Sequence, residues 1–414
     1  MKKRIVAFLT LFLLLFATVG GFCSCGNEEE VTLYVYNWGE YISDGSDGTL
    51  DVNAAFEEYC RAKGMNVRVN YSTFSSNEDM YAKIKSGAAA YDVIIPSDYM
   101  IQRMVKEELL LPLGTEANIE ERIPNYAAVH EDFKGENVYY EDDSDTVYSV
   151  PYFYGKIGII YNSSIVPEDE DSLGSWELMW DETYRGDILQ FNNSRDAFGT
   201  ALYYLGYDVN HASEAEWLEA LELLKTQKNI VQGYVMDEIF NKMKSGSAAV
   251  ASYYAGDFLS MYEDNDDLRF YYPKEGTNRY VDAMCIPVNA QNPSLAMEYI
   301  NFMCSEEIAV ANAEYTYYAS PLTTVLENED YIATMAEVNE DAMEILYGAS
   351  DIETSAYLTL DAEALTRLNL LWEELKVESS IGPGIYVTCG VILLGLLSLL
   401  LYHVLRKRRW AKLY

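Results

Sequence analysis

Strand-like and helix-like stretches alternate at the start of the folded part, and this order limits the fold more than any other feature. The strand-like runs are residues 31–37, 65–71 and 91–96, and the helical stretches between them are residues 52–63 and 78–85. A β-α-β-α-β order predicts a parallel sheet covered by helices. Ligands of such sheets bind beyond the carboxyl ends of the strands, where residues 38–41 and 97–99 fall.

A second α/β unit is expected between about residues 150 and 280. Its predicted strands are residues 157–161 and 248–254, its helices are residues 197–206 and 214–226, and a helix at residues 360–376 closes the folded part. The chain of 414 residues exceeds one typical core. No repeat and no long linker separates the two units, so we expect two lobes that exchange the chain.

Both ends of the chain are typical of membrane-directed segments. A basic start at residues 1–4 precedes an apolar run at residues 5–19, which predicts a signal peptide within residues 1–25. The following Gly21-Phe22-Cys23-Ser24-Cys25 resembles a bacterial lipoprotein signal, with Cys25 as the lipidated residue; the alternative is an uncleaved anchor.

The other end carries an uncharged, Leu-rich run of 22 residues at 384–405, long enough to cross a bilayer as a transmembrane helix. Arg406-Lys407-Arg408-Arg409 follows directly, which places the tail, residues 406–414, in the cytoplasm. Residues 30–378 are therefore expected on the extracytoplasmic side of the cell membrane.

Charge and motif content exclude several classes of function. Lys and Arg number 29 against 66 Asp and Glu, a net charge of −37, which repels nucleic acid and favours cations, although solubility alone also explains such an excess. The chain has three histidines and no motif of a hydrolase, phosphate loop or zinc protease, so we expect no enzyme and no cofactor. Cys60, Cys285 and Cys304 show no metal-ligand spacing, and no metal site is expected.

Aromatic residues and carboxylates occur together just after short apolar runs. The three clusters are Tyr36-Asn37-Trp38-Gly39-Glu40-Tyr41, Tyr253-Tyr254-Ala255-Gly256-Asp257 and Tyr280-Val281-Asp282. Carboxylates pair with ammonium groups, while ring faces attract them by cation–π interactions and cover the methylenes between. These clusters favour an organic polycation as the ligand.

Several short motifs follow one another along residues 31–376. They are Tyr36-Asn37-Trp38 with Glu40-Tyr41; Ser76-Asn77-Glu78 with Met80 and Ala82-Lys83; Tyr91-Asp92 with Pro96-Ser97; Pro151-Tyr152 with Gly155; Trp176, Trp180, Tyr184 and Gly186; Tyr272-Pro273-Lys274-Glu275-Gly276; and Ile300-Asn301-Phe302. Each motif is weak alone. Together the chain resembles the spermidine/putrescine substrate-binding proteins of bacterial ABC transporters.

The resemblance implies a two-lobed α/β fold of the periplasmic-binding-protein type (type II) that closes around its ligand. It places lobe 1 at residues 31–147 plus 281–325 and lobe 2 at residues 148–280 plus 326–378. It also implies a function: capture of putrescine or spermidine and delivery to the permease subunits of an ABC transporter. The membrane would hold the protein through the lipid anchor and the C-terminal helix.

Family pocket residues carry over position by position, and they predict a polyamine site. Its residues are Trp38, Glu40, Tyr41, Ser97, Tyr99, Asn193, Asp196, Tyr254, Asp257, Tyr280, Asp282 and Tyr318. Asn193 stands where spermidine-type members carry an aspartate, and Tyr254 and Tyr280 each replace a tryptophan. No glutamine corresponds to the family's late one near residues 357–359. Because one acid is lost at Asn193 while Asp257 is kept, a diamine is slightly favoured.

Other interpretations remain open from the sequence alone. Asp196 and Asp257 lie near helix starts and could be capping residues, and Glu40 could be a solvated loop acid. The pairs Tyr253-Tyr254 and Tyr317-Tyr318 could instead indicate a ferric-ion-binding protein of related fold. The predicted C-terminal span also fits a membrane-tethered polyamine sensor or adaptor that feeds no permease.

Overall fold

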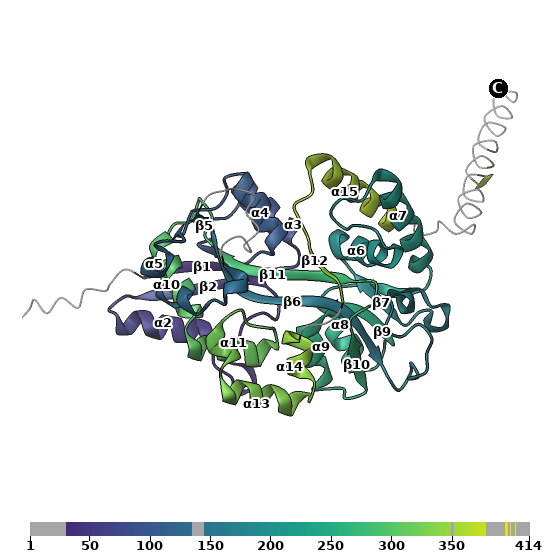
Figure 1. Cartoon of the computed structure of the whole chain (residues 1–414). Coiled ribbons are helices and arrows are strands. Elements are labelled where there is room, and N and C mark those ends of the chain that lie inside the picture. Colours follow the sequence, from purple (N-terminus) through teal and green to yellow (C-terminus); the bar gives the residue numbers. More distant parts are fainter. Residues whose placement is uncertain are drawn as a thin grey trace, which may run out of the picture.

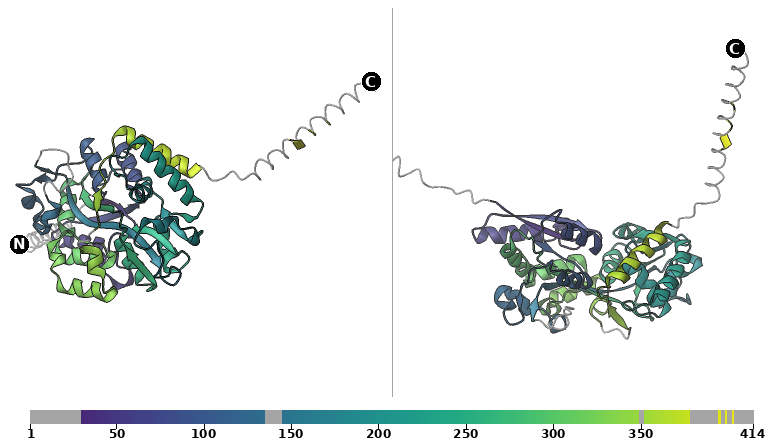
Figure 2. Two further views of the ribbon diagram at one scale, coloured as in Figure 1. Left: turned by 45° about the vertical axis from the view of Figure 1, so that its right-hand side comes forward. Right: turned by 90° about the horizontal axis from the view of Figure 1, so that it is seen from above.

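The computed structural model describes residues 30–134, 145–348 and 352–377, and the single residues Leu394, Gly395, Ser398 and Tyr402. Two lobes lie side by side in these residues (Figures 1 and 2). The first contains the strands nearest the N-terminus, in purple and blue, and the second contains the teal middle of the chain.

A ten-stranded sheet runs through both lobes, with the strand order β2-β1-β3-β11-β6-β9-β7-β8 and with β10 and β12 paired at β6 and β11. The strands are β1 (Val31–Trp38), β2 (Val67–Phe74), β3 (Val93–Ile94), β6 (Ser149–Asn162), β7 (Ile188–Phe191), β8 (Val231–Val235), β9 (Val250–Tyr254), β10 (Leu268–Tyr271), β11 (Thr277–Cys285) and β12 (Thr354–Ala356). A separate small ribbon pairs β4 (Gly114–Thr115) with β5 (Thr146–Val147). In the following, the first lobe is the part around β1–β3 and the second lobe is the part around β7–β9.

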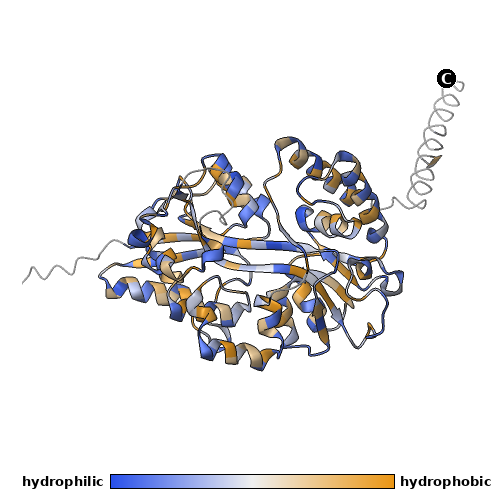
Figure 3. Cartoon of the chain, in the orientation of Figure 1, coloured by the Kyte–Doolittle hydropathy of each residue, from blue (hydrophilic) through white to orange (hydrophobic). Residues whose placement is uncertain are grey.

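Helices cover the sheet in both lobes (Figure 1). They are α2 (Val52–Ala62), α3 (Asn77–Ser86), α4 (Asp98–Lys106), α5 (Ile119–Arg122), α6 (Ser194–Leu205), α7 (Glu214–Lys228), α8 (Glu238–Lys244), α9 (Ala255–Tyr262), α10 (Pro293–Met303), α11 (Glu306–Thr316), α12 (Thr323–Leu326), α13 (Glu329–Val338), α14 (Ala342–Tyr347) and α15 (Ala362–Val377). Most of the outer helices mix hydrophilic and hydrophobic residues, while much of the strand surface is hydrophobic (Figure 3). Apolar faces of helices such as α2 and α3 pack against the sheet, whereas α13 and α15 pack on other helices.

The predicted β-α-β-α-β order is confirmed. β1 pairs in parallel with β2 and β3, and α2 and α3 connect the three strands. The third strand is shorter than the predicted residues 91–96, because only Val93 and Ile94 pair with β1 before Pro96, which has no backbone N–H to donate. The second unit also forms a parallel sheet, with β7 between β8 and β9.

Two long strands join the lobes. β6 and β11 pair antiparallel at the centre of the sheet; β11 also contacts β3 of the first lobe, and β6 contacts β9 of the second. The register between β6 and β11 shifts between Asp282 and Ala283. The chain divisions predicted for the two lobes remain a prediction, although β6 and β11 start close to two of them.

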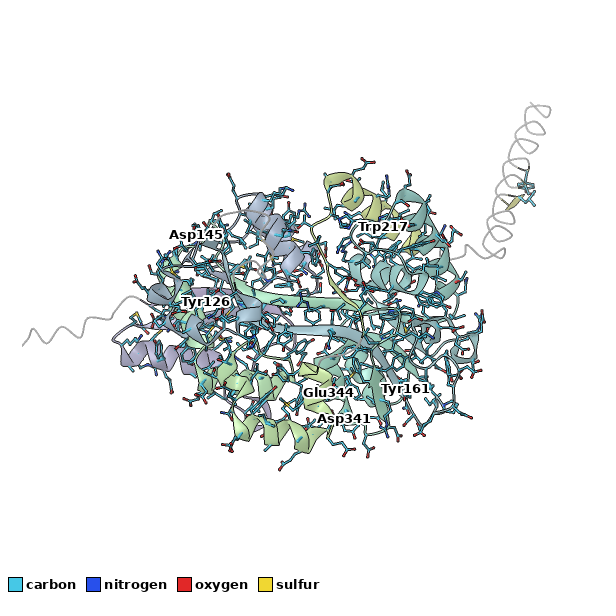
Figure 4. All side chains as sticks on the ribbon, in the orientation of Figure 1. Tyr126, Asp145, Tyr161, Trp217, Asp341 and Glu344 are labelled. Carbon is cyan, nitrogen blue, oxygen red and sulfur yellow. The ribbon has the colours of Figure 1, made fainter. Side chains whose placement is uncertain are left out.

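Each lobe has an apolar core. In the first lobe, Phe56 of α2 is fully buried and meets Tyr299 of α10 at 4.9 Å between ring centroids. In the second, Trp217 of α7 lies between helices and its ring is 5.6 Å from that of Phe198 on α6 (Figure 4). These cores hold the strands whose carboxyl ends carry the site described next.

Almost all of the predicted membrane segments lie outside the residues that the structure describes. The signal segment with Cys25 and the basic tail lie outside the described residues, as does the span at residues 384–405 except for its four described residues. Within the part of the chain that the structure describes, no helix has both the length and the apolar character needed to cross a membrane.

Candidate functional site

A cavity lies between the two lobes. Its walls come from the ends of β1 and β3 in the first lobe and of β7 and β9 in the second, together with β11. The carboxyl ends of the parallel strands therefore face one another across the cavity, as the strand order predicts. All twelve residues named from the sequence as site residues line this one cavity.

Asp282 on β11 is the central carboxylate of the cavity. It is 4% exposed and accepts hydrogen bonds from Tyr41 Oη (2.7 Å) and Ser97 Oγ (2.6 Å). Ser97 is in turn held by Asn77, whose Nδ2 lies 3.0 Å from Ser97 Oγ and whose Oδ1 accepts the Ser97 backbone N–H. Asp282 is thus oriented by residues of the first lobe.

The structure decides between the two roles that the sequence left open for Asp196 at the start of α6. Asn193 is the N-cap, and its side chain accepts the backbone N–H of Asp196 at 2.8 Å. The Asp196 carboxylate instead accepts hydrogen bonds from Asn193 Nδ2 (2.7 Å) and Tyr254 Oη (2.8 Å). Asp196 is therefore free of a capping role and faces the cavity.

Asp257 is also not a helix cap. It lies inside the first turn of α9, which begins at Ala255 with Tyr254 as the N-cap residue. Its carboxylate accepts a hydrogen bond from Tyr318 Oη at 2.8 Å. The Tyr318 ring meets that of Tyr41 edge-on at 4.6 Å between centroids, which links Asp257 to the hydroxyl that holds Asp282.

Aromatic rings form the remaining walls. Trp38 packs against Phe74 at 4.5 Å and Tyr254 against Tyr280 at 5.2 Å, both between ring centroids. The indole N–H of Trp38 is buried and has no hydrogen-bond partner among the described residues. Ring faces beside carboxylates suit a cationic ligand with apolar segments.

Several cavity residues were not found from the sequence. They include Asn77, Glu78, Asp98, Arg195, Asp237 and Tyr357. Asn77 and Glu78 belong to a motif already noticed, and Asp98 lies between two named residues. Arg195 and Asp237 gave no signal, because a buried arginine is not expected in a site for cations, and Asp237 reaches the cavity only through the packing of the lobes.

Burial dominates the electrostatics of the acidic groups. It raises the pKa of Asp257 to about 8, helped by the charges of Asp237 and Glu40 and opposed by the Tyr318 hydrogen bond. It raises the pKa of Asp98 to about 8, helped by the charge of Asp282. The pKa of Asp282 rises less, to about 6, because Ser97 and Tyr41 donate to it. Removing water without a counter-charge disfavours ionised carboxylates.

Asp98 and Glu78 extend this acidic group toward the first lobe. Asp98 accepts the backbone N–H groups of Tyr99 (2.7 Å) and Val281 (3.2 Å), which ties the start of α4 to β11. Glu78 accepts from Tyr99 Oη at 3.0 Å, and burial raises its pKa. With Glu40, Asp196, Asp237, Asp257 and Asp282, seven carboxyl groups line the cavity.

Two lobes that enclose a cavity between the carboxyl ends of their strands define the class of solute-binding proteins of the periplasmic-binding-protein type. A model of the family "Bacterial extracellular solute-binding protein" matches residues 54–339. The chain belongs to this family.

Named relatives agree with the family. The chain is 30% identical over 302 residues to the spermidine/putrescine-binding periplasmic protein of Escherichia coli, covering 73% of this chain and 80% of that one. It is 25% identical over 358 residues to the putrescine/cadaverine-binding protein of Pseudomonas aeruginosa, covering 83% and 93%. A solved structure of a putative spermidine/putrescine ABC transporter protein from Listeria monocytogenes aligns with a TM-score of 0.72 at 33% identity, covering 83% and 98%.

Proposed function

We propose that this protein captures a polyamine between its two lobes and delivers it to an ABC permease on the extracytoplasmic side of the membrane. The observation that carries this proposal is the composition of the cavity wall, where seven carboxyl groups and a set of aromatic rings lie together. The names of the relatives point to the same ligands. The twelve named residues would form the polyamine site.

Closure follows from the same charges. Without a ligand, several carboxylates in one cleft repel each other and oppose the approach of the lobes. A diammonium ligand neutralises them and replaces lost hydration by charge-assisted hydrogen bonds. A ligand that binds the closed form more tightly shifts the population toward it. This mechanism needs no chemical reaction, in keeping with a binding protein.

The ferric-ion alternative has less support. Tyr318 lines the cavity and donates to Asp257, whereas Tyr317, at the left-handed end of α11, donates to Glu263. The two tyrosines therefore do not converge on one point.

Membrane attachment through Cys25 and residues 384–405 is part of the proposal, on the strength of the lipoprotein-like signal and the 22-residue uncharged run. Holding the protein beside the permease raises its effective concentration there. Purification of the full chain from membranes in mild detergent tests this: permease subunits in the eluate support transport, and their absence supports the sensor alternative.

The ligand itself is tested by calorimetric titration of the purified full chain with putrescine, cadaverine, spermidine and spermine at two salt concentrations. Dissociation constants in the micromolar range or below for at least one of them are expected. Absence of binding by all four would overturn the proposed function and leave the fold and family in place.

One glycine at the cavity mouth provides a test of closure. A Cβ atom at residue 39, in the loop after β1, would lie 2.7 Å from Oδ2 of Asp237, at the start of α8 in the other lobe. Gly39→Ala should weaken polyamine binding by no more than a few fold, because the atom nearest to the added Cβ is the end of the exposed Asp237 side chain, which can turn away. The thermal unfolding of the ligand-free protein should change little.

Gly233→Ala in β8 is the matched control, since no atom lies within 4 Å of its added Cβ. An affinity of Gly39→Ala more than tenfold below that of Gly233→Ala would contradict this expectation and mean that Asp237 cannot turn away in the ligand-bound form.

A further inference from the structure

Asn278 is a buried hydrogen-bond acceptor without a donor. It is the second residue of β11, is 3% exposed and lines the cavity. Its side-chain Oδ1 has no hydrogen-bond partner in the part of the chain that the structure describes. Polar neighbours on the same strand are satisfied: Thr277 Oγ1 donates to the carbonyl of Ile157 at 2.6 Å, and both oxygens of Asp282 accept hydrogen bonds. A buried acceptor left unpaired is costly, so Asn278 requires a donor from a ligand.

One face of β11 carries three groups that together suit a polyamine. The side chains of a strand alternate between its two faces, and Asn278, Tyr280 and Asp282 are the described residues of β11 that line the cavity. Residues 279–282 pair with β6 in regular register, and the shift comes only after Asp282. This face therefore presents an amide oxygen, an aromatic ring and a carboxylate in a row that leads toward the first lobe, where β11 meets β3 (Figure 1).

Asn278 lies at the α6 end of the cavity. The residue of β12 that pairs with it is two positions before Tyr357, whose ring centroid is 4.4 Å from the guanidinium carbon of Arg195 on α6. Burial raises the pKa of Glu78 and of Asp196, and the charge of Arg195 opposes the rise in both, so these three groups are neighbours. Two carboxyl groups against one guanidinium favour an ammonium group at this end.

The spacing along β11 decides which polyamines reach Asn278. Asn278 and Asp282 are four positions apart, which is about 13 Å at the rise of a strand. Spermidine has nine bonds between its terminal nitrogens, as many as three residues of extended chain, and so spans about 10 Å. With a hydrogen bond at each end, it can join the two side chains. Putrescine has five such bonds and spans about 6 Å, so a putrescine held at Asp282 ends short of Asn278.

We infer that Asn278 is a length-selective ligand residue: its amide oxygen accepts an N–H from the terminal ammonium group of a triamine whose other end is held by Asp282. This inference rests on the proposed function and adds a residue to the proposed site. The ring of Tyr280 lies between the two and covers the methylenes. Because the amide is uncharged, it adds an acceptor without adding to the repulsion among the carboxylates of the ligand-free cavity.

The first experiment compares spermidine and putrescine by calorimetry on the full chain and its variants. Asn278→Leu should weaken spermidine binding about tenfold, the scale of a lost hydrogen bond to a charged group, and putrescine binding by less than about twofold. Asn278→Asp keeps the acceptor and adds a charge, so it should bind spermidine at least as tightly as the unaltered protein. Asn369→Leu, at an exposed position of α15 outside the cavity, is the matched control and should change neither affinity.

Equal losses for the two ligands in Asn278→Leu, as a merely structural role would give, would overturn the inference. An unchanged affinity for spermidine in this variant would do the same. Binding of putrescine without binding of spermidine by the unaltered protein would also overturn it and would leave the proposed function intact. No binding of any polyamine would instead refute the proposed function itself.

The second experiment needs no variant and is decisive if Asn278→Leu fails to fold. The unaltered full chain is titrated with the straight-chain diamines of six, eight and ten carbon atoms. The eight-carbon diamine has the same nine bonds between its nitrogens as spermidine, and it should bind more tightly than both of the others. Added methylenes alone change the affinity steadily with length, so a steady change without this maximum would overturn the inference.

Discussion

Asp282→Asn should weaken polyamine binding by roughly 2–4 kcal/mol, the scale for removing one partner of a buried charge pair. Asp282 is 4% exposed at the centre of the cavity, and Tyr41 and Ser97 already donate to both of its oxygens. Asparagine keeps the size of the side chain but loses the charge that an ammonium group requires. Calorimetric titration with the best-bound polyamine measures the loss.

The matched control is Asp169→Asn, which makes the same chemical change at an exposed position away from the cavity. It should leave the affinity unchanged within about 0.5 kcal/mol, as for exposed charges. If Asp282→Asn also changes the affinity by no more than this, Asp282 does not contact the ligand, and the centre of the proposed site is wrong.

Polyamine affinity should rise with pH between about 5 and 8, with release of protons on binding. Burial raises the pKa of Asp257 and Asp98 to about 8 and that of Asp282 to about 6. An ammonium group binds the ionised carboxylate, so each group that must ionise changes the affinity by up to tenfold per pH unit. Calorimetric titrations with the polyamine in buffers of different ionisation enthalpy measure how many protons are released on binding.

The stability of the ligand-free protein should show the opposite trend. A carboxyl group with a raised folded-state pKa adds stability that is fully present below its ordinary value near 4 and is lost as the pH rises through 8. The ligand-free protein should therefore unfold at a higher temperature at pH 5 than at pH 8.

Asp257→Asn should reduce the number of protons released on polyamine binding by about one. If the variant releases as many protons as the unaltered protein, Asp257 ionises independently of the ligand.

Local patterns were sufficient to predict most of the fold. The spacing of apolar residues placed α2 and α3 between strands, and the order of the elements required β1, β2 and β3 to be parallel. The motifs that resemble polyamine-binding proteins named twelve residues, and the structure brings all of them to one cavity. The fold prediction was confirmed, and the twelve residues meet, because both depend on the order of residues along the chain and on the shared edge of a parallel sheet. That these residues bind a polyamine stays a prediction.

Helix starts were predicted less well, because capping depends on backbone geometry at single residues. Asp196 and Asp257 are both near helix starts in the sequence, yet Asn193 caps α6, and Asp257 lies within the first turn of α9. An aspartate near a helix start is compatible with either a cap or a free carboxylate. The choice is made by the tyrosine hydroxyls that donate to each carboxylate, which come from distant parts of the chain.

The sequence by itself determined the class of fold, the acidic character of the site and the ends of the strands at which it lies. Tertiary structure alone decided which charges meet. It brings Asp237 to Gly39 from the other lobe and places Asp282 behind the hydroxyls of Tyr41 and Ser97. It also brings the charge of Arg195 close enough to Glu78 to oppose the rise that burial causes in the Glu78 pKa. The reason is physical: periodicity and composition act through neighbours along the chain, whereas burial and Coulomb energies depend on distances between groups that only the closed arrangement of two lobes defines.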